Sequence, residues 1–179
     1  MASPAGPGLF FCFAACLLLI FVSVSSPTWE KISFLNVGNL HYGVFGHTGT
    51  GKHIGYTFDG IKNTGIGPLT KALILHPIAA GLSGLAVLFG ICGASYHRAG
   101  TILMSVAASL AFLITLIIWV IDMIMFGIAK NRYNGNGGHA AQYGNANWLT
   151  LGALIALALG FCAGTIGSFG SYRRRRAAY

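Results

Sequence analysis

Four long apolar runs, separated by polar and glycine-rich segments, dominate the hydrophobic pattern of the chain. They are Leu9–Val24, Ala72–Ala94, Ile102–Ile128 and Trp148–Phe169. A helix needs ~20 apolar residues to cross a bilayer, and inside lipid each backbone polar group must be satisfied within its own segment. The pattern therefore predicts a single membrane domain over 1–179, an all-α four-helix bundle with helices at about 8–26, 72–95, 101–128 and 148–170.

The polar segments define two loops, one turn and a tail. The loops are 27–71 and 129–147, the turn is 95–100 and the tail is 171–179. In the first loop, Leu40–Phe45 and His53–Phe58 are rich in β-branched and aromatic residues and flank a turn-rich stretch, which predicts a small β-hairpin. The second loop is rich in Gly and Asn and has no periodicity. The short turn makes the second and third helices antiparallel neighbours.

The first apolar run has two interpretations, a signal peptide or a retained helix. Signal peptides carry a basic segment before the apolar core and a small-residue cleavage site after it. No basic residue precedes Leu9, and Pro27 directly follows the small residues Ser25 and Ser26. We therefore favour a helix that is not cleaved.

Composition supports the membrane assignment and indicates an orientation. The chain is 55% hydrophobic and 8% charged, with 11 Lys and Arg against 3 Asp and Glu. Four cations are consecutive, Arg173, Arg174, Arg175 and Arg176. Basic clusters beside a membrane helix favour the cytoplasmic side and attract anionic lipid. We expect both termini in the cytoplasm, both loops outside the cell, and contact between these arginines and the anionic inner leaflet.

Asp122 is the one ionisable residue in the third apolar run. A carboxyl group at the centre of a membrane helix costs on the order of 2.5–3.5 kcal/mol, so it should face protein. His76 lies at a similar depth in the second helix, which begins either near Ala72 with a kink at Pro77 or at Pro77 itself. We predict a hydrogen bond or ion pair between His76 and Asp122, mainly structural in role. The alternative partner is the start of the fourth helix, around 145–148, whose free amides suit a carboxylate.

Small residues recur at steps of four along the last apolar run. They are Gly152, Ala156, Gly160, Gly164 and Ser168, and they include one GxxxG pair. Small residues allow close approach of helix backbones in lipid. This face predicts a helix–helix contact, either within the chain or between two copies.

Catalytic and cofactor chemistry has little support in this sequence. The stretch from Gly46 to Lys52 matches the start of a phosphate-binding loop, but His53 follows where Ser or Thr is needed, and the βαβ context is missing. The histidines form no standard ligand pattern, and no Ser/His/Asp or HExxH set is present. We predict no enzyme activity, no metal site, no cofactor and no nucleic-acid partner. Loop histidines, including His41, His47, His53 and His139, are either ordinary solvated side chains or groups that charge in acid.

Several segments together resemble one known family. They are GVFG at 43–46, HIGYTFDG at 53–60, HPIAAGL at 76–82, WVIDMIMFGIAKNR at 119–132 and YGNANWLTLGA at 143–153. The combination is similar to the fungal PalI family of four-span plasma-membrane proteins, which is related to the eisosome-associated tetraspans and is claudin-like in architecture. Family members often carry a cysteine pair in the hairpin, whereas His47 to Lys52 contains none.

The resemblance implies a non-enzymatic role at the plasma membrane. The protein would assist or scaffold a membrane receptor in ambient-pH signalling, or organise membrane domains. Its partners would be a pH-sensing receptor, membrane lipid and, as an open possibility, a second copy of the chain. The alternative from the residues alone is a small proton-linked channel or transporter that uses Asp122.

Overall fold

The computed structural model of the chain describes residues 6–58, 67–94, 98–135 and 140–176, except for the side chains of 94, 98 and 167–176. The helical elements are α1 (Gly6–Ser23), the 3₁₀ helix η1 (Pro68–Ile74), α2 (Leu75–Ala94), α3 (Arg98–Gly135) and α4 (Ala146–Arg176). Four of the helical segments are long and apolar enough to cross a membrane. The four-helix bundle predicted from the hydrophobic pattern is confirmed.

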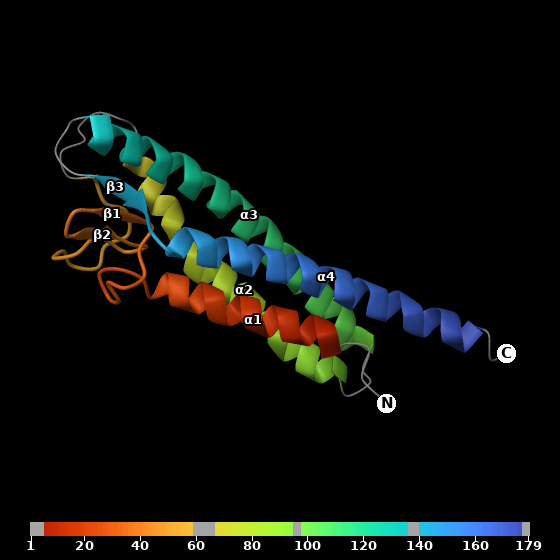
Figure 1. Cartoon of the computed structure of the whole chain (residues 1–179). Coiled ribbons are helices and arrows are strands. Elements are labelled where there is room, and N and C mark those ends of the chain that lie inside the picture. Colours follow the sequence, from red (N-terminus) through yellow and green to blue (C-terminus); the bar gives the residue numbers. More distant parts are fainter. Residues whose placement is uncertain (1–5, 59–66, 95–97, 136–139, 177–179) are drawn as a thin grey trace.

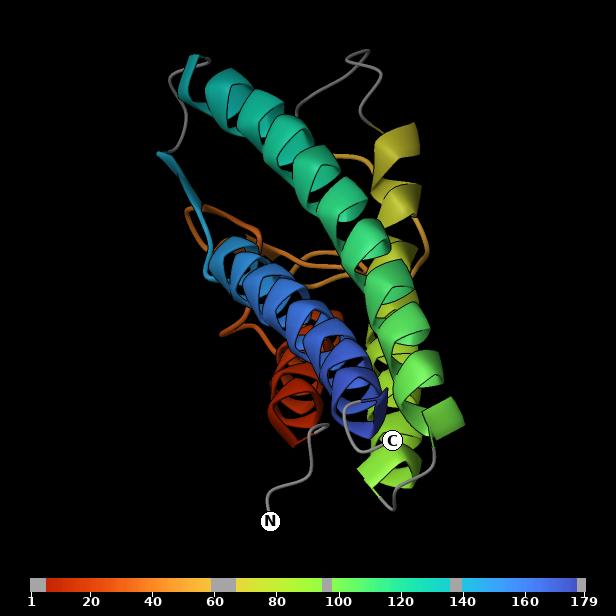
Figure 2. The ribbon, with the colours of Figure 1, turned by 90° about the vertical axis from the view of Figure 1, so that its right-hand side faces the viewer.

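The four helices form a closed bundle with the loops at one end. Helix α1 packs on α2 and α4, and α3 packs on α2 and α4. Figure 1 shows the sheet and loops together at one end, which we call the loop end, and both chain termini toward the other. Figure 2 shows α1 beside α4 and α2 beside α3.

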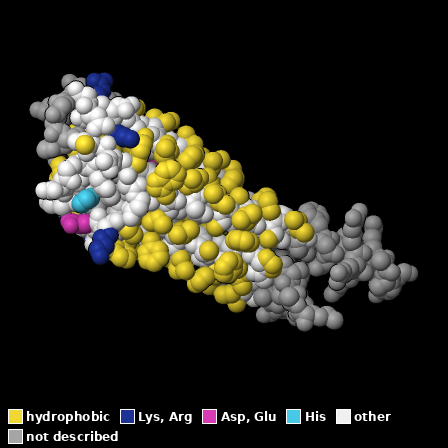
Figure 3. All heavy atoms as spheres, viewed as in Figure 1, with side chains coloured by type: hydrophobic (Ala, Val, Ile, Leu, Met, Phe, Trp, Pro, Cys, Tyr) yellow, Lys and Arg dark blue, Asp and Glu magenta, His cyan; other side chains and the backbone are white. Residues whose placement is uncertain are grey.

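The outer faces of the helices are apolar. Figure 3 shows hydrophobic side chains over the length of the bundle on one face, with charged side chains and histidine confined to the loop end among the described residues. Large side chains stay exposed on these faces, for example Leu88 at 58% and Ile117 at 54%. In a soluble protein such a surface would cause association. It is the surface expected of helices that contact lipid tails.

A three-stranded sheet joins the two loops. Strands β1 (Leu35–Val37) and β2 (Leu40–Tyr42) belong to the first loop and β3 (Ala141–Tyr143) to the second. The order is β2-β1-β3, and both pairs are antiparallel. Because β1 lies in the middle, it connects the two loops through backbone hydrogen bonds.

The first loop does contain the expected β-hairpin, but at an earlier position. Its turn is Gly38-Asn39, and Gly38 has a φ of 58°, a left-handed conformation that glycine adopts without strain. The predicted second strand, His53–Phe58, has no strand residues. A two-residue Gly-Asn turn matches the twist of antiparallel strands, which explains why the hairpin forms there and not around the longer GHTGTGK stretch.

The second loop is more ordered than its composition indicates. Helix α3 continues past Ile128 to Gly135. The side chain of Asn134 then accepts a hydrogen bond from the backbone N–H of Ala141 at 2.7 Å, so it acts as a partner for the outer edge of β3. This order depends on tertiary contacts and therefore left no periodic signal in the sequence.

The small-residue face of α4 packs within the chain. A Cβ at Gly160 would lie 3.0 Å from the Cys12 sulfur in α1, and one at Gly164 would lie 2.9 Å from Met104 Cε in α3. Gly152 is less crowded, since a Cβ there would lie 3.6 Å from Leu18. Ala156 is half-buried, and the side chain of Ser168 lies outside the described residues.

Gly160→Leu should lower the thermal stability of the purified protein in lipid nanodiscs. The bulky side chain has to displace α1, and overpacking of this kind costs about 1–3 kcal/mol. The matched control is Gly81→Leu in α2, because a Cβ at that position would meet nothing within 4 Å. Equal melting temperatures for the two variants would mean that the α1–α4 contact is not tight.

Candidate functional site

His76 and Asp122 lie together in the bundle interior near the loop end. Asp122 belongs to α3 and His76 to α2, and both side chains are fully buried. His76 Nε2 and Asp122 Oδ2 are 3.2 Å apart. The distance is that of an ion pair, but the angles do not meet hydrogen-bond geometry, and neither carboxylate oxygen has a hydrogen-bond partner among the described residues. The two groups therefore depend on each other electrostatically.

Pro77 explains the orientation of the histidine ring. Helical geometry assigns the N–H of residue 77 to the carbonyl of Leu73, but proline has no N–H to donate. His76 Nδ1 lies 3.2 Å from that Leu73 oxygen. A carbonyl can only accept, so Nδ1 carries the proton, and Nε2 faces Asp122. Helical structure runs through η1 and α2, and α2 begins at Leu75, so the helix starts before Pro77 and not at it.

The buried pair is uncharged overall when one proton is shared between Nε2 and Oδ2. With no proton, a carboxylate would face the lone pair of Nε2. With two protons, an unpaired imidazolium would be left in the interior. Both of these states bury a net charge, which is strongly unfavourable. A single shared proton is therefore the arrangement that leaves no net charge in the interior.

Phe34 of the first loop covers the pair. Its ring lies edge-on to the His76 ring, with the two ring centroids 5.1 Å apart. It stacks on the Phe126 ring of α3, with the centroids also 5.1 Å apart. Phe34 is fully buried. Its backbone donates to the Tyr42 carbonyl and accepts from the Gly144 N–H, so the residue above the pair is fixed by both flanking strands. The loops thus close the site at the loop end.

A second layer of aromatic residues lies against this cover. Phe58 contacts both Phe126 and Tyr42, and the hydroxyls of Tyr42 and Tyr133 are 2.8 Å apart. Tyr56 donates its hydroxyl proton to the Gly43 carbonyl at 2.8 Å. Burial raises the pKa of the Tyr56 hydroxyl well above its usual value, and the nearby Asp122 carboxyl acts in the same direction. The Tyr56 residue as a whole is half-buried.

The start of α4 serves the loops rather than Asp122. Asn147 donates to the Phe34 carbonyl at 2.8 Å. Asn145 accepts from the Ser33 N–H at 3.1 Å and donates to the Lys31 carbonyl at 2.8 Å. The alternative partner for the carboxylate, the region 145–148, therefore binds the first loop in this structure.

The other candidate residues are dispersed. His41 and His47 are half-buried in the loops, His53 is exposed, and His139 lies outside the described residues. Helix α4 reaches Arg176, but the side chains of Arg173, Arg174, Arg175 and Arg176 are likewise outside the described set. Among the described residues, no three His, Cys, Asp or Glu side chains gather as metal ligands would.

Sequence reasoning missed Phe34 and the part it plays. The signal that could have located it is the Gly38-Asn39 turn, because two-residue turns of this kind join antiparallel strands. With the turn placed there, Phe34 precedes a strand that carries Leu35 and Val37 on one face. Its contact with His76 depends on the packing of the loop and could not be inferred from spacing.

The fold and this site define a class, the multi-pass membrane proteins in which ordered loops close one end of a four-helix bundle. A family model described as the SUR7/PalI family matches residues 5–160. The chain belongs to the SUR7/PalI family.

One curated relative is the pH-response regulator protein palI/RIM9 of Emericella nidulans. The two are 35% identical over 99 residues, which cover 46% of this chain and 18% of the relative. The chain therefore matches less than a fifth of that protein's length.

Asp122→Asn should be tolerated better than Asp122→Leu. The asparagine amide can donate to His76 Nε2, whereas leucine leaves that buried nitrogen without a partner, at a cost of about 1–3 kcal/mol. The measurement is denaturant unfolding in nanodiscs. Thr115→Val is the matched control, because the buried Thr115 hydroxyl donates to the Ala111 carbonyl of its own helix and to no other group in the described part of the chain. Equal stability of the leucine and asparagine variants would show that the His76 contact contributes nothing.

Stability should fall at alkaline pH, and Tyr56 should contribute to the fall. Its folded-state pKa is raised, so its contribution is complete below the unfolded pKa of about 10 and is lost as the pH rises above that value. Tyr56→Phe should cost about 0.5–1.5 kcal/mol at neutral pH, because the Gly43 carbonyl loses its donor. Above about pH 10 the variant should lose stability less steeply than the parent. Unfolding curves across this range provide the test, and parallel curves would contradict it.

Proposed function

We propose that this protein is a non-enzymatic plasma-membrane accessory that assists or scaffolds a membrane receptor in ambient-pH signalling. Membership of the SUR7/PalI family and the similarity to a pH-response regulator support a role in ambient-pH signalling. The observation that carries the accessory role is the attachment of the loops to the bundle. A loop surface held rigidly on membrane helices is suited to presenting a binding face to another membrane protein.

The attachment is made at three places. Phe34 packs over His76, strand β1 pairs with strands of both loops, and Asn145 binds the backbone of the first loop. The Phe34–His76, β1–β3 and Asn145–Lys31 contacts each join segments that are distant in the sequence. The loop end and the helix interior therefore form one structural unit, in which a change at the surface can reach the bundle.

The proposed orientation places both termini in the cytoplasm and the loop end outside the cell. The four consecutive arginines at the end of α4 support it, because basic clusters stay on the cytoplasmic side and attract anionic lipid. A second copy of the chain stays a possible partner. The Gly160–Gly164 face is occupied by α1 and α3, so a second copy would use another surface.

The proton-channel alternative has less support. The buried hydroxyls of Ser83, Ser105 and Thr115 each donate to a carbonyl of their own helix, at 2.8, 3.0 and 2.7 Å. A proton path requires side chains that bond to one another or to water. At the loop end, the aromatic ring of Phe34 covers the His76–Asp122 pair.

The test is replacement of the matching segment in the Emericella nidulans relative by this chain. A strain that lacks palI/RIM9 would receive the chimaera, this chain alone, or an empty vector, each protein carrying a fluorescent tag. Growth and transcript profiles would be compared in acid and alkaline medium. We expect the chimaera to reach the plasma membrane and restore the strain's response to pH. A chimaera that reaches the plasma membrane but behaves like the empty vector contradicts the proposal.

A further inference from the structure

An open polar hollow of about 530 Å³ lies on the loop end, between the two loops. The first loop contributes Glu30, Lys31, Ser33, Asn36 and His41, and the second contributes Tyr143, Gly144 and Asn145. Figure 3 shows a histidine, an acidic side chain and a basic side chain gathered on this end of the molecule. Both loops are fixed here by the β1–β3 pairing, so the hollow is preformed.

His41 is held in the hollow with one ring nitrogen committed. Its Nδ1 lies 2.8 Å from Asn36 Oδ1, which also accepts the Ser33 hydroxyl at 2.6 Å. Because this oxygen only accepts, Nδ1 carries a proton in every charge state of the ring. Nε2 is then the group that gains or loses a proton. A neutral His41 offers a lone pair there, and a charged His41 offers an N–H donor.

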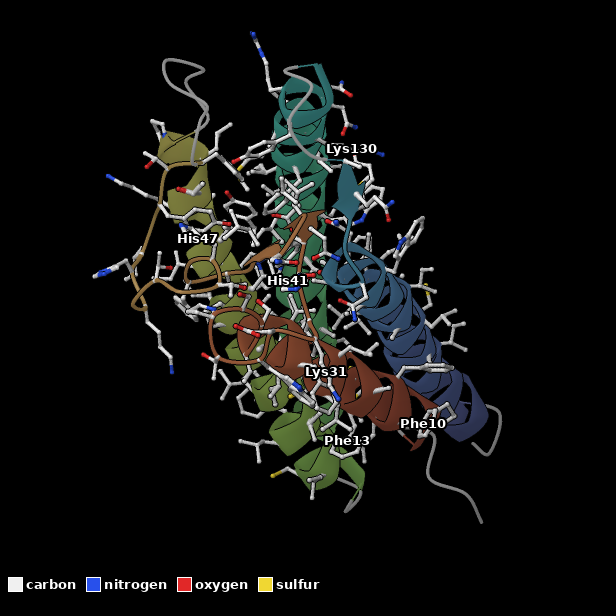
Figure 4. All side chains as sticks on the ribbon, turned by 60° about the vertical axis from the view of Figure 1, so that its left-hand side comes forward. Phe10, Phe13, Lys31, His41, His47 and Lys130 are labelled. Atoms are coloured by element: carbon white, nitrogen blue, oxygen red, sulfur yellow. The ribbon has the colours of Figure 1, made fainter. Side chains whose placement is uncertain are left out.

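One cation lines the hollow together with the histidine, and a second lies against a lining residue. Lys31 is exposed on the rim, and Lys130 Nζ lies 4.6 Å from the centre of the Tyr143 ring that lines the other side. Figure 4 shows His41 between Lys31 and Lys130 in this view. Glu30 is the one acid among the lining residues. With His41 protonated, Lys31 and His41 oppose Glu30 within the lining, so the hollow carries a net positive charge and favours an anionic ligand.

We infer that this hollow binds an acidic segment of a partner protein and that protonation of His41 strengthens the binding. Charge complementarity identifies the partner's chemistry, since carboxylates match the Lys31 ammonium group and the Nε2 donor of a charged imidazole. The inference rests on the proposed accessory role. It adds to that role the contact surface, the type of partner and the direction of the pH effect.

The direction follows from the histidine charge. Histidine side chains change charge between about pH 5 and 8, so acid medium adds a positive charge to the hollow and neutral or alkaline medium removes it. Glu30, Lys31, Lys130 and Tyr143 are the other titratable groups around His41, from the first loop, α3 and β3. His47 lies on the other side of β2 against the Tyr42 ring and does not line the hollow. Binding should therefore be tighter in acid and weaker as the pH rises.

The test measures binding of a hexa-aspartate peptide to the full chain in phosphatidylcholine nanodiscs. We expect about two- to fivefold tighter binding at about pH 5.5 than at about pH 7.5, the effect of one added exposed charge pair. His41→Asn should abolish this difference, because the asparagine amide can still donate to Asn36 but does not titrate. Lys31→Gln should weaken binding at both pH values, and Glu30→Gln should strengthen it at both.

His53→Asn is the matched control, since His53 is an exposed histidine of the same loop that does not line the hollow. It should keep the full pH difference. An unchanged pH difference in His41→Asn overturns the inference. A second result also overturns it. If the variants of the lining residues, His41→Asn, Lys31→Gln and Glu30→Gln, alter binding to phosphatidylserine vesicles but not to the peptide, the anion is a lipid headgroup. The assay uses purified protein, so its failure is distinct from failure of the chimaera in cells.

Discussion

The burial of the Asp122 carboxyl in a membrane helix is the constraint on which the rest of this structure depends. The group is fully buried and lies 3.2 Å from His76. Such a group requires a partner and a dry environment, because water that entered the site would weaken the attraction between the two side chains. The partner comes from α2, and the dry environment comes from the loops. The polar residue inside the bundle thereby explains the order outside it.

Phe34 connects these two requirements. Its ring covers His76, and its backbone carbonyl accepts hydrogen bonds from Gly144 and from Asn147 at the start of α4. A loop residue with only the ring contact would not be held in place by the loops. One with only backbone hydrogen bonds would leave the buried pair uncovered. Because Phe34 does both, its position over His76 depends on contacts with both loops. The same residue therefore takes part in the order of the loop end and in the cover over the buried pair.

The parts of the structure that could be predicted from sequence are those set by local pattern. Helix number follows from the length of apolar runs, and the His76–Asp122 contact was expected from similar depth on neighbouring helices. The parts that could not be predicted depend on tertiary contacts. Strand β3 forms because β1 and Asn134 satisfy its two edges, and the composition of the second loop alone indicates only a flexible connection. The position of the first-loop hairpin was misplaced because a long turn-rich stretch outweighed the two-residue Gly38-Asn39 turn.

The insulation of the buried pair has a consequence for where a response to pH can arise. A fully buried pair covered by Phe34 lies away from the medium, which suits a structural role. A group that reports acidity needs contact with the medium and a fixed orientation, so that a change in its charge changes one defined interaction. His41 meets both conditions, since Asn36 orients its ring and the open hollow exposes the site. The rigid interior and the titratable surface are thus complementary, because a rigid support allows a single surface charge to alter binding without altering the fold.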